Sequence, residues 1–580
     1  MDSVTVGPGQ PVESGGARTR SRGTTVAAAP RRSFWDRTLD HYPSTAARYW
    51  YLAIVVLAAI VLYYEFYVQA AVTPSIIAHF HMTWPFFVYL VVAGNAVGAF
   101  ASLLAGLSDR WGRANLVTYG LLVTALVVLF GMPNAPNMWM YAILYALLGF
   151  VEGIILVATP ALIRDFSPQM GRASAMGFWT MGPVMASLTV ALVSSHTLSH
   201  LHAWQDQFII CGIAGLAVFF LAFFGLRELS PGLRGQLMVS MRDRQLVEAR
   251  ARGIDVDKTL AHPWRQVLHF DVIGPSLGIA VFLIVYYTLI AFLVVYMATI
   301  FGYTLQRANA LGNWVWAFDA AALVLVGFAS DKLRVRKPFM VVGVVGAVVT
   351  TALFALRADH PATGYYTFVL ILSPMAVFLG FVFGPWLAAF TETVEARNPA
   401  LIATGLAIWG WVLRIVVAGS LFILPFVVTS MTPLVEHGQQ VQTLAARYAP
   451  EVATIGAVDS ATAARLTANP SDQAAIGKAV TEISQKLNVP PAVALQRLLA
   501  VSKVPRSDLA YLAAHGPQVL HAKAVSPGEW RRWWWICVGA ELLLLPFIFV
   551  MKGRWSPKRA RQDEEIHEEK VAQELKGIAA

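Results

Sequence analysis

The chain has 580 residues, of which 57% are hydrophobic and only 13% are charged. Soluble domains carry roughly a quarter charged residues, so this composition excludes an ordinary soluble enzyme and indicates a membrane protein. The formal net charge of +10 does not indicate nucleic-acid binding, because the basic residues lie at the ends of apolar segments and in the longer loops. Both cysteines, Cys211 and Cys537, fall inside apolar segments, which excludes a disulfide framework and a cysteine-based metal site.

The first 48 residues are polar and rich in arginine, glycine, serine and threonine. Such a segment buries too little apolar surface to fold, so residues 1–48 are predicted to form a disordered basic arm in the cytoplasm. The first apolar segment begins only near Tyr49, after this arm. We therefore expect no cleaved signal peptide.

Twelve segments follow that are long enough to cross a bilayer, whose core of about 30 Å needs about 20 apolar residues per helix. The first six lie near residues 49–73, 84–107, 115–131, 138–163, 174–195 and 207–226. The second six lie near residues 272–300, 308–329, 338–356, 364–390, 401–429 and 533–551. The pattern predicts an all-α membrane protein of two six-helix bundles, with no room for an enzyme domain.

Polar segments divide the chain into predicted domains. These are an N-terminal bundle at 49–226, a cytoplasmic linker at 227–271, helices 7–11 at 272–431, an insert at 432–528, helix 12 at 529–551 and a charged cytoplasmic tail at 552–580. In the insert, Pro490 and Pro491 precede the run AVALQRLL, which is typical of a helix opened by proline. We expect a small helical subdomain there, outside the membrane.

The basic residues of the short loops predict the orientation. The loops that would face the cytoplasm contain nine of them, namely Arg110, Arg113, Arg164, Arg172, Lys332, Arg334, Arg336, Lys337 and Arg397. The loops that would face outward contain only Arg307 and Arg357. Because cytoplasmic loops are enriched in lysine and arginine, both termini are predicted to be cytoplasmic and the insert extracytoplasmic. We expect a multi-pass protein of a bacterial inner membrane.

Two copies of one loop motif occur at equivalent places in the two halves. After the second segment the chain reads GLSDRWGR, from Gly106 to Arg113, and after the eighth it reads GFASDKLRVRK, from Gly327 to Lys337. With these loops the chain resembles the major facilitator superfamily, whose motif is Gly, three residues, Asp, Arg or Lys, one residue, Gly, Arg. The resemblance covers roughly residues 49–551 and leaves out the tails and the insert.

The resemblance implies two bundles related by pseudo-two-fold symmetry around a cavity that opens alternately to each side. It also implies that the motif residues hold the cytoplasmic side shut: the expected gating residues are Asp109, Arg110, Arg113, Asp331 and Lys332. The second copy has Arg334 in place of the motif's inner glycine, which puts its tight turn in doubt. Arg336 and Lys337 are interpreted as ordinary cytoplasmic anchors.

Ionisable residues in the middle of apolar segments are costly, so each needs a reason. Glu152, Asp319 and Arg414 lie near mid-depth by residue count, and Glu65 lies somewhat farther out. Glu65, Glu152 and Asp319 are the candidates for proton coupling. Asp319 and Arg414 belong to the same predicted bundle, however, and a structural ion pair between them is the alternative.

Arg414 and Trp411 are three residues apart and share a helix face. A guanidinium grips a carboxylate with two donors while a nearby indole covers an apolar body, so the pair suggests a small organic anion. Asn95, Asn313 and one of Tyr63 and Tyr64, with Tyr64 preferred, are candidate polar contacts to that substrate. The resemblance places Tyr145 where the family often has an arginine.

These features predict a secondary active transporter that moves a small organic anion by proton-coupled alternating access, with symport favoured. No P-loop occurs in the sequence, so ATP is not the expected energy source and no cofactor or metal is expected. The expected partners are the substrate, protons, the lipid bilayer and an unknown partner for the insert. Two alternatives remain open: a proton-antiport exporter of drugs or metabolites, of which Gly182 and Pro183 are a motif fragment, and a membrane sensor or scaffold acting through the insert.

Overall fold

The computed structural model describes residues 37–102, 111–167, 178–234, 236, 268–397 and 402–579. Nearly all regular structure in these ranges is helical, and twelve helices are long and apolar enough to cross a membrane. The all-α membrane fold predicted from the sequence is therefore confirmed. Two short strands, β1 (Thr38–Leu39) and β2 (Glu228–Leu229), pair in parallel.

The first half of the chain forms six spans. They are α1 (Thr45–Ala71), α3 (Trp84–Ser102), α5 (Arg113–Leu126) with its extension to Asn134, α6 (Met138–Phe166), α8 (Gly182–Thr197) and α9 (Trp204–Gly225). Asn137 caps α6, because its side-chain oxygen accepts hydrogen bonds from the backbone N–H groups of Trp139 and Met140. A short helix, α2 (Thr73–Phe80), follows α1.

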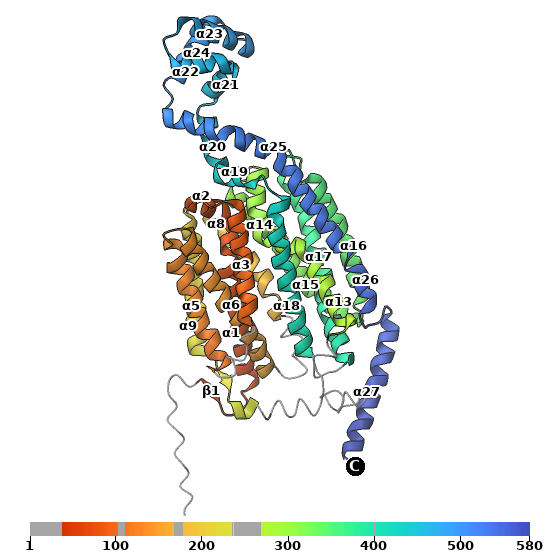
Figure 1. The fold of residues 1–580 in the computed structure, drawn as a ribbon. Coiled ribbons are helices and arrows are strands. Elements are labelled where there is room, and N and C mark those ends of the chain that lie inside the picture. The colour runs from red at the N-terminus through yellow and green to blue at the C-terminus, as the bar shows by residue number, and fades with distance from the viewer. Residues whose placement is uncertain are drawn as a thin grey trace, which may run out of the picture. The chain divides into compact units, whose positions relative to one another are not determined.

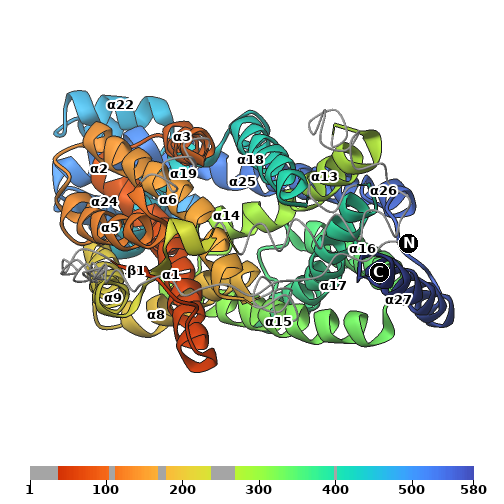
Figure 2. The same cartoon turned by 90° about the horizontal axis from the view of Figure 1, so that it is seen from below.

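The second six spans are less regular. They are α13 (Phe270–Phe282) with α14 (Ile284–Ile300), α15 (Leu305–Leu333), α16 (Lys337–Arg357), α17 (Tyr365–Arg397), α18 (Ile402–Val427) and α25 (Arg506–Leu542) with α26 (Leu545–Val550). The seventh span is interrupted at Leu283, whose ψ of 3° departs from the helical value. Figure 2 shows the helices of the first half gathered on one side and most of those of the second half on the other, with α14 between them.

The segment between the eleventh and twelfth spans is helical, as predicted. It contains α19 (Met431–Glu436), α20 (Gly438–Arg447), α21 (Ala449–Ala457), α22 (Ser460–Ala468), α23 (Gln473–Leu487) and α24 (Pro491–Val501). Ala457, Ile483 and Ala494 form the small buried core of its distal part. The long helix α25 then runs without a break from the insert into the last span (Figure 1).

The bundles thus have two distinguishable ends (Figure 1). We call the end that carries residues 428–505 the insert end, and the end at which β1 and α27 (Pro557–Ala579) lie the terminal end. Odd-numbered spans of the first half run toward the insert end, so Ala71 at the end of α1 lies there. Residues 1–36 of the arm predicted at 1–48 fall outside the described residues, as does most of the linker predicted at 227–271. The described part of the arm contains β1 and the start of α1, so residues 37–48 are not the disordered segment that was predicted.

Two histidines of the insert stack on each other. The rings of His437, which follows α19, and His515 of α25 have centroids 3.7 Å apart, and His437 Nδ1 lies 3.0 Å from the hydroxyl of Tyr511. Burial lowers the pKa of His437; the nearby His515 and His81 lower it further, and Glu436 acts in the opposite direction. The folded protein therefore favours neutral His437.

This pKa direction predicts a loss of stability in acid. Below the ordinary histidine pKa of about 6.5, the unfolded chain binds more protons at this site than the folded one, so stability falls as the pH falls. The melting temperature of the purified protein, measured from pH 8 to pH 5, should fall less steeply in His437→Gln than in the wild type. His521 is exposed and lies on α25, the helix that carries His515, so His521→Gln provides the control. An equal effect of His521→Gln would contradict the assignment to His437.

Candidate functional site

A cavity lies between the two halves of the protein, and its empty space, with open solvent included, is about 470 Å³. Helices α1, α3 and α6 line it from the first half, and α14 and α18 line it from the second. Its polar lining residues are Tyr67, Gln69, Thr73, Asn95, Tyr145 and Tyr287. The walls are otherwise apolar, so the cavity suits a small molecule that carries a few polar groups.

A second cavity of about 360 Å³ lies between α1, α8, α14 and α15. Tyr67 of α1 and Ile290 of α14 line both cavities. The contact between α1 and α14 therefore separates two spaces along the same boundary between the halves.

A carboxylate and a guanidinium from opposite halves meet over Gly98. Neither Glu152 nor Arg414 lines either cavity, but Asn95 and Tyr145, which lie on the same two helices as Gly98 and Glu152, line the first. A Cβ atom placed on Gly98 of α3 would lie 3.2 Å from both Glu152 Oε2 of α6 and Arg414 Nη1 of α18. The two charges interact electrostatically, yet within the described ranges Arg414 forms no hydrogen bond and no direct ion pair. Glu152, and not Asp319, is therefore the carboxylate nearest to Arg414, and the structural pair considered from the sequence is absent from the described residues.

Paired glycines bring these charges together. Gly94 and Gly98 face Gly149 and Gly153, and a Cβ on Gly153 would lie only 2.2 Å from the Gly98 carbonyl oxygen. Small residues four positions apart allow two membrane helices to pack backbone to backbone. The close crossing of α3 and α6 brings Glu152 next to Gly98. Because Gly98 has no side chain, the Arg414 guanidinium has space to approach Glu152 there. The spacing of these glycines was visible in the sequence but was not used.

Tyrosines surround the charged pair. Tyr63 of α1 and Tyr287 of α14 each interact electrostatically with both Glu152 and Arg414. The ring of Tyr67 lies 5.6 Å from that of Tyr63. Tyr64, the residue preferred from the sequence, is instead buried near Cys211 of α9, inside the first half. Tyr63 therefore occupies the place predicted for Tyr64, and sequence reasoning missed Tyr67 and Tyr287.

The other predicted substrate contacts are divided. Asn95 lines the cavity, and its amide nitrogen donates to the carbonyl of Val91 at 2.9 Å. Asn313 lines neither cavity; its amide donates to the Ser195 hydroxyl at 3.0 Å and so links α15 to α8. Trp411 is 47% exposed and also lines neither cavity.

Two of the predicted proton-coupling residues lie inside single bundles. Glu65 fits into a notch beside Gly215 of α9, where both of its oxygens are buried without a hydrogen-bond partner. Asp319 lies beside Gly380 of α17, and its Oδ2 is likewise buried and unpartnered. Neither residue lines either of the two cavities, because the helices turn these carboxylates toward neighbours of their own bundle.

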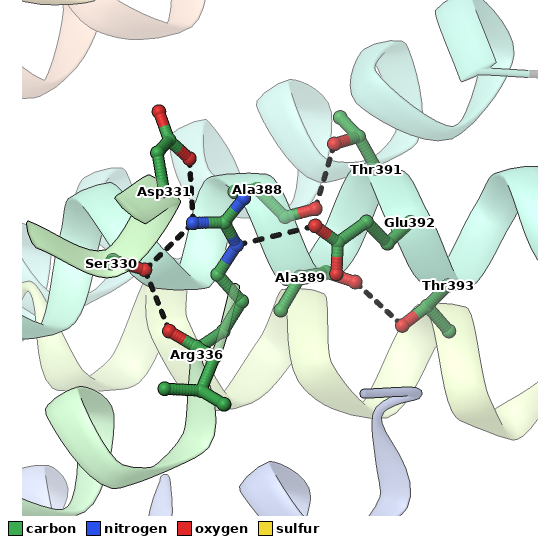
Figure 3. Close-up of polar contacts among 9 residues, drawn as sticks. Ser330, Asp331, Arg336, Ala388, Ala389, Thr391, Glu392 and Thr393 are labelled. Carbon is green, nitrogen blue, oxygen red and sulfur yellow. Dashed lines mark hydrogen bonds and ion pairs between the residues drawn. The ribbon is translucent and has the colours of Figure 1, made fainter. Parts of the chain in front are cut away.

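The motif loops form ion clusters at the terminal end. In the second half, Arg336 pairs with Asp331 at 2.6 Å and with Glu392 of α17 at 3.2 Å (Figure 3). In the first half, Arg113 pairs with Asp165 at the end of α6 at 2.8 Å. The two clusters join equivalent helices of the two halves, and Arg336 is a member of one rather than a simple anchor.

The remaining motif residues are placed as follows. Lys332 is exposed, and Asp109 and Arg110 lie outside the described residues. Gly112 has φ of +87°, and a side chain there would collide with Glu228, which accepts a 2.6 Å hydrogen bond from Arg113 N. Arg334 adopts φ of +58°, so the tight turn doubted for the second copy does form.

The halves contact each other firmly at the insert end. The Asn309 amide of α15 donates to the Ala71 carbonyl of α1 at 3.0 Å. The Trp84 ring lies 5.1 Å from that of Phe292 of α14. At the terminal end, the described contacts of Arg113 with Asp165 and of Arg336 with Asp331 and Glu392 each join residues of one half. The cavity is therefore closed toward the insert end in this conformation.

No group of three or more His, Cys, Asp or Glu side chains in the described ranges is arranged to hold a metal ion. The chemistry available at the site is thus that of one carboxylate, one guanidinium and several hydroxyl groups.

Known proteins resemble the chain over parts of its length. The multidrug resistance protein MdtG of Salmonella choleraesuis is 35% identical over 123 residues, which are 21% of this chain and 30% of that protein. The probable anion transporter 3, chloroplastic, of Oryza sativa is 24% identical over 294 residues, which are 47% of this chain and 55% of that protein. The chain therefore spans about half or less of these curated relatives.

A solved structure and a family model cover more. The crystal structure of a bacterial homolog of the human lysosomal transporter Spinster superposes with a TM-score of 0.56 at 15% identity, covering 89% of this chain and all of that one. This likeness shows the fold. The model of the Major Facilitator Superfamily matches residues 55–418, more than half of the sequence. The chain belongs to the Major Facilitator Superfamily.

Proposed function

We propose that the protein is a secondary active transporter that carries a small organic anion together with a proton. The observation that supports this most is the meeting of Glu152 and Arg414 from opposite halves over Gly98, on helices that line the cavity. A guanidinium stays charged at any accessible pH, so the half-buried Arg414 within its membrane span needs an anionic neighbour. Either the Glu152 carboxylate or a substrate carboxylate fulfils this need.

The two anions compete for one cation, and this competition couples the proton to the substrate. A proton that neutralises Glu152 leaves Arg414 without its counter-charge, so a substrate carboxylate then binds there. When the substrate leaves, Arg414 again favours the ionised form of Glu152, and the proton departs. Tyr63 and Tyr287 hold their hydroxyl groups at the same place and serve as neutral hydrogen-bond donors to the substrate.

The predicted topology sets the direction of access. With the insert outside the cell membrane, a structure closed at the insert end faces the cytoplasm. A monovalent anion and a proton that enter together carry no net charge, so the pH gradient drives their uptake. Each unit of pH gradient supplies about 1.4 kcal/mol, which supports about tenfold accumulation of the substrate. Uptake is therefore the direction that the proposal favours.

Proton-driven uptake into proteoliposomes tests the proposal. The purified protein should accumulate at least one labelled mono- or dicarboxylate when a pH gradient is imposed, and the accumulation should collapse with an uncoupler. The match to MdtG, a multidrug resistance protein by name, makes drug export the rival function. Movement of cationic drugs against the proton gradient, without transport of any organic acid, would establish the rival.

A further inference from the structure

The insert begins with a helix that lies across both halves of the protein. Helix α19 packs against α2 and α3 of the first half and against α14 and α25 of the second. Its residues Met431, Leu434 and Val435 are buried. This helix lies between the eleventh and twelfth spans, beyond residue 418, where the match to the superfamily ends.

One buried carboxylate fixes α19 to the second half. Glu529 of α25 is 7% exposed. Its oxygens accept hydrogen bonds from the Thr429 hydroxyl at 2.6 Å, the Ser430 N–H at 2.9 Å and the Ser430 hydroxyl at 3.0 Å. The next residue, Trp530, directs its indole N–H at the Met431 sulfur at 3.3 Å. Hydrogen bonds to a carboxylate are among the stronger ones in proteins.

The contact of α19 with the first half is weaker. The backbone N–H of Trp84, at the start of α3, donates to the Thr432 hydroxyl at 3.3 Å. The Trp84 ring is fully buried, between Phe292 at 5.1 Å and Trp530 at 6.4 Å. One neutral hydrogen bond therefore holds α19 to the first half, whereas three hydrogen bonds to a carboxylate hold it to the second half. When the halves separate at the insert end, the Trp84–Thr432 contact is the one that breaks.

We propose that α19 is a gate of the transport cavity, held by Glu529 and closed by the contact between Thr432 and Trp84. Helix α19 contacts Trp84, the first residue of α3, and Asn95 of the same helix lines the cavity farther along. Opening the cavity toward the insert end requires α19 to leave α3 and to move with α18 and α25. Glu529 is a positioning residue in this device, and it does not touch the substrate.

Cysteine accessibility tests the gate without relying on transport. The only two native cysteines, Cys211 and Cys537, are both fully buried, so Asn95→Cys provides a reporter in the cavity. A membrane-impermeant maleimide is added on the insert side, and the labelling rate is measured. Thr432→Val, which removes one neutral hydrogen bond and keeps the shape, should raise the rate about two- to tenfold.

Glu529 variants and a matched control complete the experiment. Glu529→Ala should raise the labelling rate more than Thr432→Val, and Glu529→Gln should fall between parent and alanine variant because it keeps one acceptor oxygen. Tyr448→Phe removes another bond from the insert to α25, the one between the Tyr448 hydroxyl and Asp508 at 2.9 Å, and should leave the rate unchanged. Unaltered labelling in Thr432→Val, or an equal rise in Tyr448→Phe, overturns the gate. Thr432→Val decides the matter if Glu529→Ala fails to fold.

Discussion

Arg414→Lys is expected to weaken binding of the anion about tenfold to a hundredfold while the protein still folds. A lysine keeps the charge but cannot offer a carboxylate the two parallel donors of a guanidinium. Loss of one charge-assisted hydrogen bond corresponds to about 1.5–3 kcal/mol. The measurement is the apparent affinity of the transported anion in proteoliposomes, compared with that of the wild type.

The chain offers a matched control and a decisive double variant. Arg531, which pairs with Asp359 on the half-exposed surface of α25, should tolerate lysine without effect on transport. If Arg414 serves only to balance Glu152, then Glu152→Gln combined with Arg414→Gln should transport normally. A fully active double variant would refute the anion site and the substrate class with it.

Glu152→Gln is expected to abolish accumulation against a gradient but to retain exchange of labelled for unlabelled substrate. Glutamine keeps the size and hydrogen-bonding capacity of protonated glutamate, so the cavity stays competent to bind and reorient. It cannot give up a proton, however, and the roughly tenfold accumulation that one unit of pH gradient allows should fall to equilibration. The experiment compares concentrative uptake with counterflow in the same proteoliposome preparation.

Other buried carboxylates serve as controls for Glu152. Glu541 is fully buried in the second half, where its Oε1 accepts a 2.8 Å hydrogen bond from Thr351. Glu541→Gln should therefore leave coupling intact. Glu65→Gln discriminates further: coupling that is lost there and kept in Glu152→Gln would move the proton site into the first bundle.

The spans could be predicted from the sequence because hydropathy is a local property. The segment expected near 138–163 is the helix Met138–Phe166, and that expected near 338–356 is Lys337–Arg357. What hydropathy does not report is a helix that continues beyond the membrane. The sequence suggested a boundary at residue 528, whereas α25 runs through it from Arg506.

Counting residues predicted that Glu152 and Arg414 lie at a similar level, and the two side chains approach each other over Gly98. The direction of most other side chains could not be predicted. Successive residues of a helix point about 100° apart, so Tyr63 faces the central site and Tyr64 faces α9. Glu65 follows Tyr64 and also faces its own bundle. Which of these side chains faces the other half depends on how each helix is rotated about its axis relative to its neighbours.

The residues predicted to form the gate show how little the spacing of a motif says about its partners. The motif marked Asp331 and Lys332, and the structure joins Asp331 to Arg336. Glu392 completes that cluster from a helix 56 residues away in the chain. A residue that acts through a long-range partner is not identifiable from its own loop.

The central claim is that one anion and one proton share the Glu152–Arg414 site, and proton movement driven by the anion tests it most directly. Proteoliposomes with the membrane potential clamped at zero are given an inward gradient of the transported anion and no pH gradient, and the lumen pH is recorded. The lumen of wild-type vesicles should acidify as the anion enters, and the lumen of Glu152→Gln vesicles should not. Anion entry without acidification in the wild type, or undiminished acidification in Glu152→Gln, would contradict the claim.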